Sequence, residues 1–281
     1  MSELDIQPAD GVGAYIGGID LNQDISDAAL SEMRQTLGDY GVLFFREQTI
    51  SPERHIMMAE RFGGININRF FGHVTGHPKI AEVRKEPDQR SNIGGSWHTD
   101  HSYDEIPAMG SILVARELPN RGGDTVFANM FTAFDSLSEG LQETLMGMRA
   151  VHSSRHVFGD KSRYKSENSD LGGRLGNTDA AQQDAVHPVI IRHPISGRRA
   201  LYINSNFTTH FDGWTKEESQ PLIDYLVRHA TRPEYIHKFC WQPGSIAFWD
   251  NRATWHYAIN DYHGQRRLMH RITVEGEALA A

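Results

Sequence analysis

The sequence has little cysteine, no long apolar run and no excess of basic residues, and each absence narrows the class of protein. A single cysteine, Cys240, excludes an internal disulfide and a C-x-x-C metal site. Its place between Phe239 and Trp241 predicts a buried apolar role. No stretch approaches the roughly 18 apolar residues of a membrane helix, and the acidic start, residues 1–5, predicts no signal peptide. A net charge of −8 argues against nucleic-acid binding. We therefore expect a protein of the reducing cytoplasm.

Several common enzyme motifs are also missing. The sequence contains no H-E-x-x-H, no G-x-S-x-G and no Walker A loop. The glycines of residues 11–18 do not have the spacing of a dinucleotide-binding loop. Hydrophobic residues make up 39% of the chain, as in ordinary globular proteins. Without repeats, linkers or low-complexity segments, residues 1–281 are expected to form one domain.

Hydrophobic periodicity, caps and turn residues predict the secondary structure. Amphipathic spacing between capping residues predicts four helices, at about 26–40, 51–62, 132–148 and 215–231. Short apolar runs between turns predict strands at 41–45, 80–83, 111–115, 125–129, 188–192, 200–204, 235–241, 245–249 and 267–274. Many short strands with few helices predict a mainly β fold with flanking helices, of jelly-roll type. Residues 152–187 are polar and irregular, which is typical of a lid over a site or of a plain surface loop.

A histidine and a carboxylate lie two residues apart in the stretch that ends at Asp100. On an extended strand His98 and Asp100 would share one face, with Thr99 facing away. Far downstream, His256 stands in another strand-like stretch. Two histidines and one carboxylate leave coordination positions open, as in the facial triad of non-haem Fe(II) oxygenases. An isolated H-x-D is common in turns, so its weight depends on the rest of the sequence.

Two arginines share one face of the strand predicted at 267–274. Arg267 and Arg271 would be costly inside a barrel unless each met an anion, and a carboxylate can bind a guanidinium through two hydrogen bonds. The alternative is a solvated outer face. His270 lies on the opposite face and is expected to be structural. Thr125 follows a Gly-Gly-Asp turn, and its hydroxyl could donate to a carboxylate.

These motifs together resemble the taurine dioxygenase family over nearly the whole chain. The resemblance rests on His98-Thr99-Asp100, Gly122-Gly123-Asp124-Thr125, Trp249-Asp250-Asn251, His256-Tyr257-Ala258 and Gln265-Arg266-Arg267-Leu268-Met269-His270-Arg271. It implies a double-stranded β-helix, a jelly-roll variant, and an oxygenase that consumes 2-oxoglutarate and O2. It also implies that His98, Asp100 and His256 bind Fe(II), and that Arg267 and Thr125 bind 2-oxoglutarate.

The resemblance further implies a pocket for a small anionic substrate. Arg271 corresponds to the family residue that binds the substrate's acidic group, and Phe158 and Phe207 correspond to aromatic pocket positions. Asn68 stands where taurine dioxygenase has a sulfonate-binding histidine, and Phe71 lies close by. These differences predict a bulkier acid than taurine: a sulfonate, a sulfate ester, or an aryloxy or alkyl carboxylate. The sequence is also similar to the aryloxyalkanoate dioxygenases of the same family.

The expected reaction hydroxylates a substrate C–H while 2-oxoglutarate is converted to succinate and CO2. Hydroxylation beside a sulfonate or ether oxygen would fragment the product. The family also implies a homodimer or homotetramer. Two other hypotheses stay open: an inactive jelly-roll protein that binds a small anion through Arg267 and Arg271, and a hydrolase or lyase that uses another divalent metal.

Overall fold

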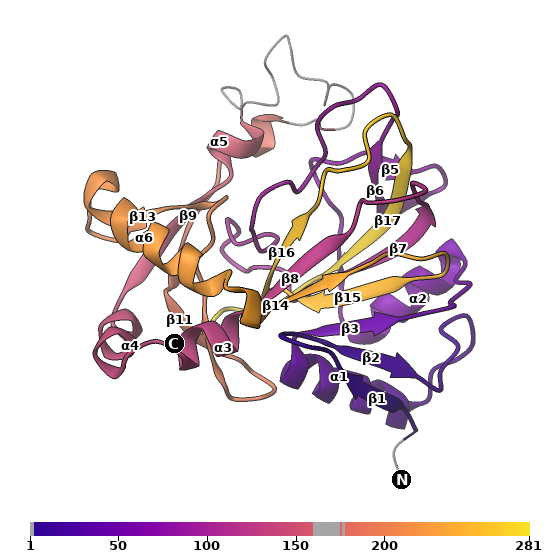
Figure 1. Cartoon of the computed structure of the whole chain (residues 1–281), viewed down its shortest axis with the longest axis horizontal. Helices are drawn as coiled ribbons and strands as arrows, with labels where there is room; N and C mark the ends of the chain where they lie inside the picture. The colour runs from indigo at the N-terminus through magenta and orange to yellow at the C-terminus, as the bar shows by residue number, and fades with distance from the viewer. Residues whose placement is uncertain (1–2, 160–174, 176–177) are drawn as a thin grey trace.

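A large, mostly antiparallel sheet forms one side of the molecule in the computed structural model, which describes residues 3–159, 175 and 178–281 (Figure 1). Its strands, in spatial order, are β1 (Asp5–Pro8), β2 (Ala14–Gly17), β3 (Val42–Phe45), β15 (Ile246–Asp250), β7 (Gly110–Glu117), β17 (Arg267–Val274), β6 (His77–Lys85) and β5 (His73–Val74), with β4 (Ile65–Asn66) on β17. All of its pairs are antiparallel except β2 with β3.

A smaller antiparallel sheet packs against the large one. It consists of β14 (Ile236–Phe239), β8 (Thr125–Asn129) and β16 (Thr254–Ala258). The core between the two sheets includes Phe127 and Phe239 of the small sheet with Phe44, Trp249 and Met269 of the large sheet. Two antiparallel sheets that share one core confirm the predicted mainly β fold with a jelly-roll core.

Two helices cover the outer face of the large sheet (Figure 1). Helix α1 (Asp27–Tyr40) begins after Ser26, whose hydroxyl accepts a 3.0 Å hydrogen bond from the amide of Ala29, and it ends at Gly41 with a φ of 78°. Helix α2 (Pro52–Phe62) begins after Ser51, which caps the amide of Arg54. Both helices start and end where the capping residues predict.

A third group of elements packs beside the two sheets around a separate apolar core. Its helices are α3 (Met130–Asp135), α4 (Glu139–Met146), α6 (Lys216–Ala230) and the short η3 (Pro233–Tyr235). Its strands are β9 (Arg149–Ser153), β10 (Asp184–Pro188), β11 (Ile190–Arg192), β12 (Arg199–Leu201) and β13 (Thr208–Phe211). Helix α6 begins with a complete capping box between Thr215 and Glu218, close to its predicted start.

The single helix predicted at 132–148 is wrong, because the chain forms α3 and α4 with a break between them. Helix α3 begins earlier than predicted, since the Asn129 side chain caps its first amides. At the break, the side-chain amide of Gln142 donates hydrogen bonds of 3.0 to 3.2 Å to three backbone carbonyls, including that of Phe134. Those bonds satisfy the end of α3 and let α4 start in a new direction.

The predicted lid at 152–187 lies partly outside the described residues. Its described ends include β9 and β10, which pair antiparallel, so the irregular segment is shorter than predicted at both ends. Between them are α5 (Arg155–Phe158) and η2 (Thr178–Ala180). The sequence alone did not show this pairing, because strands this short leave little periodicity.

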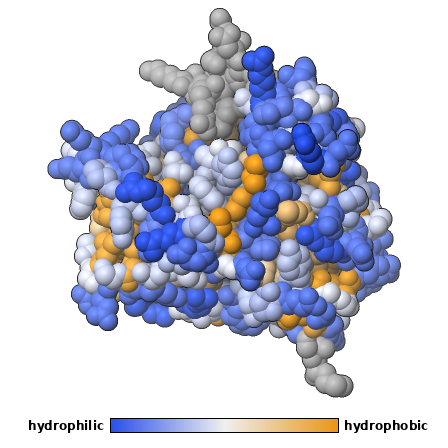
Figure 2. Space-filling view, viewed as in Figure 1, coloured by the Kyte–Doolittle hydropathy of each residue, from blue (hydrophilic) through white to orange (hydrophobic). Residues whose placement is uncertain are grey.

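Cys240 is exposed, so its predicted burial is wrong. Phe239 and Trp241 point into the core, and residues between two inward-facing neighbours face outward. None of the helices in the described part of the chain is long and apolar enough to span a membrane. The face drawn in Figure 2 is mainly hydrophilic, with apolar side chains in small strips.

Candidate metal centre and adjoining cavity

The loop that carries His98 and Asp100 is joined to strand β16 at one point. His98 and His256 form an isolated bridge, with backbone hydrogen bonds of 3.1 and 2.8 Å. Directly after Asp100 the chain turns, because His101 has a φ of 59°. The His101 ring holds this conformation through a 2.8 Å hydrogen bond to Asp104. The predicted extended strand at His98–Asp100 is therefore wrong beyond His98, while the strand predicted around His256 is confirmed.

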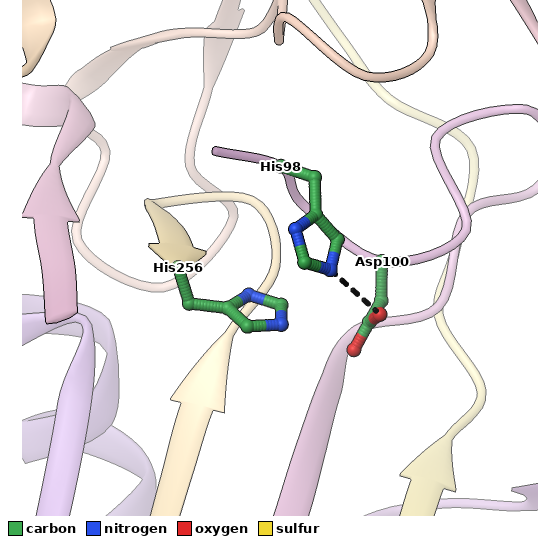
Figure 3. Close-up of side chains that lie close together, drawn as sticks. All are labelled: His98, Asp100 and His256. Carbon is green, nitrogen blue, oxygen red and sulfur yellow. Dashed lines mark ion pairs between the residues drawn. The ribbon is translucent and has the colours of Figure 1, made fainter. Parts of the chain in front are cut away.

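The side chains of His98, Asp100 and His256 nevertheless converge (Figure 3). One ligand atom from each lies within 4.8 Å of the others, and all three residues are buried. The His98 Nε2 atom is 3.8 Å from Asp100 Oδ1, and the two imidazole centroids are 4.1 Å apart. Within the described residues, this is the one such cluster of three potential ligands.

Hydrogen bonds and burial set the protonation of the cluster. His98 Nδ1 lies 2.7 Å from the carbonyl of Ser96, so Nδ1 carries the proton and Nε2 keeps its lone pair. Burial lowers the pKa of both His98 and His256, which keeps the imidazoles neutral. Burial raises the pKa of Asp100, but nearby positive charge, chiefly that of Arg271, outweighs it, and the net shift is downward. Two neutral imidazoles and a carboxylate are the donor set that a divalent transition metal requires.

Thr99, between the two ligands, fastens the loop. Its hydroxyl donates a 2.6 Å hydrogen bond to the carbonyl of Asn251 in the β15–β16 turn. The side chain of Asn251 accepts a 2.9 Å bond from Trp249 Nε1. The two chain segments that carry the ligands are thus tied to each other beneath the cluster. The sequence predicted only that Thr99 faces away, and the Trp249-Asp250-Asn251 motif was the signal for its partner.

Arg267 is buried without an anion. It is 4% exposed, and neither its Nε nor its Nη2 atom forms a hydrogen bond. Its guanidinium lies 5.7 Å from the ring centroid of Trp241, and burial lowers its pKa. Trp241 Nε1 donates a 3.0 Å bond to the Thr125 hydroxyl, which leaves the threonine proton free to donate elsewhere. A buried cation without a salt bridge, beside a free hydroxyl, suits a ligand carboxylate.

Arg271 shares a cavity with Arg267, so their predicted common face is confirmed. Arg271 forms an ion pair with Asp100, in which its Nη1 atom donates to both carboxylate oxygens at 3.1 and 3.2 Å. Its Nε is buried without a partner, and its guanidinium lies 4.8 Å from the ring centroid of Phe71. His270 faces away from the cavity and accepts a 3.1 Å bond from Arg116, as expected of a structural histidine.

The cavity extends from the metal cluster along an apolar wall. It contains all three candidate ligands, Thr125, both arginines and three of the predicted substrate residues: Phe71, Phe158 and Phe207. Asn68 does not line it. Its side-chain oxygen instead accepts bonds of 2.9 and 3.0 Å from the amides of Phe70 and Phe71. Asn68 thus shapes the turn that presents Phe71, a local role typical of asparagine. Tyr103, which the sequence did not single out, also lines the cavity.

Comparison with known proteins gives a consistent result. The family model "Taurine catabolism dioxygenase TauD, TfdA family" matches residues 5–273. The chain is 34% identical to an alpha-ketoglutarate-dependent sulfate ester dioxygenase of Pseudomonas putida, over 98% of this chain and 90% of that protein. It is 30% identical to an alpha-ketoglutarate-dependent 2,4-dichlorophenoxyacetate dioxygenase of Burkholderia sp. (strain RASC), over 93% and 92%. A taurine dioxygenase structure from Burkholderia xenovorans superposes with a TM-score of 0.81 at 31% identity, covering 99% of this chain and 92% of that one.

Proposed function

The chain belongs to the taurine catabolism dioxygenase TauD, TfdA family, and on this premise we propose how it works as an alpha-ketoglutarate-dependent dioxygenase. His98, Asp100 and His256 hold Fe(II), and Arg267 with Thr125 binds the 2-oxoglutarate carboxylate remote from the metal. The observation that carries this assignment is the buried Arg267 guanidinium, which has two unpartnered donors in the same cavity as the triad.

When bound, Fe(II) with 2-oxoglutarate and O2 supplies the oxidation that hydroxylates a substrate C–H and releases succinate and CO2. The residues of the chain position the reactants and exclude water. Ser96 fixes the His98 tautomer through its carbonyl, and Ser111 donates a 2.9 Å hydrogen bond to Asp100. Such contacts around the ligands set their orientation and basicity. Arg267 and Thr125 then orient 2-oxoglutarate by charge and hydrogen bonding.

We propose that the primary substrate is a small organic acid: a sulfate ester, a sulfonate, or an aryloxy or alkyl carboxylate. The named relatives support a sulfate ester and an aryloxy carboxylate among these. The unpartnered Nε of Arg271 is available to the acid group, while Phe71, Phe158 and Phe207 contact the apolar body. Hydroxylation of a carbon that bears a sulfate or ether oxygen gives an unstable product, which fragments to a carbonyl compound.

The relatives favour catalysis over the inactive anion-binding alternative, since they are named as dioxygenases. We further propose a cytoplasmic enzyme of one domain over residues 1–281 that assembles as a homodimer or homotetramer. Light scattering after size-exclusion chromatography measures the assembly, and a monomer would contradict that part of the proposal.

The test is anaerobic addition of Fe(II) and 2-oxoglutarate to purified protein, followed by the weak visible charge-transfer band of the chelate. We expect a band in the wild type, none in His98→Ala, and a weakened band in Arg267→Ala. Arg266→Ala is the matched control, because Arg266 lies outside the cavity and pairs with Glu86 and Glu117. Bound iron without a band would favour the binding-protein or other-metal alternatives.

A further inference from the structure

Tyr103 stands at the junction between the metal cluster and the aromatic wall. Its ring lies edge-on to that of Phe207, with centroids 4.8 Å apart, and 6.0 Å from that of Phe158. It lines the same cavity as Arg271 and is only 3% exposed. Tyr103 is therefore held rigidly by its aromatic neighbours, as a residue that determines shape and specificity must be.

The Tyr103 hydroxyl is the unusual feature, because it forms no hydrogen bond with any residue in the described part of the chain. A tyrosine hydroxyl in a closed site normally has a partner, and the Tyr103 oxygen is not among the fully enclosed polar atoms, so it is open to a partner in the cavity. The phenylalanine rings in contact with Tyr103, those of Phe70, Phe158 and Phe207, offer no acceptor. A molecule that enters the cavity can therefore supply the partner.

The charges around Tyr103 indicate what that partner is. Arg69 and Arg271 act on the phenol together with Asp104 and Asp100. The carboxylates are already occupied, since Asp104 accepts from Arg69 and His101, and Asp100 accepts from Arg271. Burial raises the pKa of Tyr103, and the nearby Asp104 adds to the shift, so the hydroxyl keeps its proton and can donate it. The Tyr103 hydroxyl lines the same cavity as the unpartnered Nε of Arg271, and two such donors together suit an oxyanion.

We propose that the Tyr103 hydroxyl donates a hydrogen bond to the anionic head group of the substrate, beside Arg271, and so determines specificity. This inference rests on the proposed function of the cavity. The head group would contact Tyr103 and Arg271 while the apolar body lies along Phe158 and Phe207. Phenylalanine at position 103 would keep the wall and lose only the donor.

The test compares Tyr103→Phe with the wild type in anaerobic titrations of the Fe(II)–2-oxoglutarate enzyme. Ethyl sulfate, hexyl sulfate and phenoxyacetate serve as probes, and the change in the chelate band gives their Kd. Losing a hydrogen bond to a charged group should weaken binding by about 10- to 100-fold. The loss should be the same for ethyl and hexyl sulfate, because the hydroxyl contacts the head group and not the chain. The Kd for 2-oxoglutarate should not change.

Tyr202→Phe is the matched control. Tyr202 is 2% exposed, its hydroxyl is buried without a partner, and it lies outside the cavity. Probe binding to this variant should equal that of the wild type. If Tyr103→Phe changes the Kd of the probes by less than twofold, the hydroxyl binds only water. If only hexyl sulfate binds more weakly, the hydroxyl contacts the alkyl chain of the substrate and not its head group. Either result overturns the inference and leaves the proposed function intact. A normal chelate band that none of the probes perturbs would overturn the inference together with the proposed substrate class. The absence of a chelate band in the wild type would refute the proposed dioxygenase function itself.

Discussion

Replacing Arg267 with methionine should stabilise the metal-free protein while weakening 2-oxoglutarate binding. Arg267 and Arg252 are both 4% exposed, but their surroundings differ. Arg252 donates to Asp250 at 2.7 and 2.9 Å, and this carboxylate outweighs burial and raises its pKa. Burial lowers the pKa of Arg267, for which no carboxylate within the described residues serves as a partner. The two arginines are thus a natural pair for comparison.

The magnitudes follow from the contacts. Each unpartnered buried donor of Arg267 costs about 1–3 kcal/mol, and its contact with Trp241 returns about 0.5–2 kcal/mol. The two donors together cost about 2–6 kcal/mol, so Arg267→Met should raise the free energy of unfolding by up to about 5 kcal/mol in the absence of ligand. Arg252→Met leaves Asp250 buried and unpaired, and should lower the free energy of unfolding by about 3–5 kcal/mol.

Urea unfolding of metal-free protein measures both changes. A second series, anaerobic with Fe(II), compares stability with and without 2-oxoglutarate at about 100 times its Kd. The wild type should gain about 2.7 kcal/mol from 2-oxoglutarate, and Arg267→Met should gain much less at the same concentration. Loss of stability in metal-free Arg267→Met, similar to that in Arg252→Met, would show that Arg267 has a structural partner and would refute the reasoning.

Three other substitutions test the surroundings of the site. Thr99→Val removes the 2.6 Å hydrogen bond to Asn251 and should weaken metal binding by about 10- to 100-fold, measured by anaerobic titration with Co(II). An unchanged affinity would show that the loop of His98 and Asp100 and the β15–β16 turn keep their positions without this bond. Trp241→Phe removes the donor to Thr125 and should raise the KM for 2-oxoglutarate by about tenfold at unchanged kcat, whereas a lower kcat alone would point to a general distortion. Phe158→Ala should raise the KM for hexyl sulfate more than for ethyl sulfate, because it removes apolar surface that packs on the longer alkyl chain. Equal effects on the two substrates would show that Phe158 does not contact the alkyl chain.

The sequence predicted best where local chemistry alone decides the structure. Helices α1, α2 and α6 begin at their predicted caps, because Ser26, Ser51 and Thr215 satisfy backbone amides a few residues away. The two-residue spacing of His98 and Asp100 indicated a shared site. It did not reveal the turn after Asp100, since His101 adopts a positive φ only because Asp104 holds its ring.

The sequence alone could not predict contacts between segments that are distant along the chain. The partner of Arg271 is Asp100, which lies in a separate loop, and no local pattern links the two. The same holds for Trp241 and Thr125. Asn68 was expected at the substrate because of its sequence position, but its side chain caps its own turn. The exposure of Cys240, in contrast, could have been predicted, because residues along a strand face inward and outward in alternation.

The central claim is that His98, Asp100 and His256 support an oxidation that consumes 2-oxoglutarate. The most direct measurement is succinate release by purified protein with Fe(II), 2-oxoglutarate and O2, in the presence of an alkyl sulfate or an aryloxyacetate. We predict substrate-triggered succinate in equal amount to the fragmented product, none without O2, and none from Asp100→Ala. Product formation that needs neither O2 nor 2-oxoglutarate would contradict the account and indicate a hydrolase.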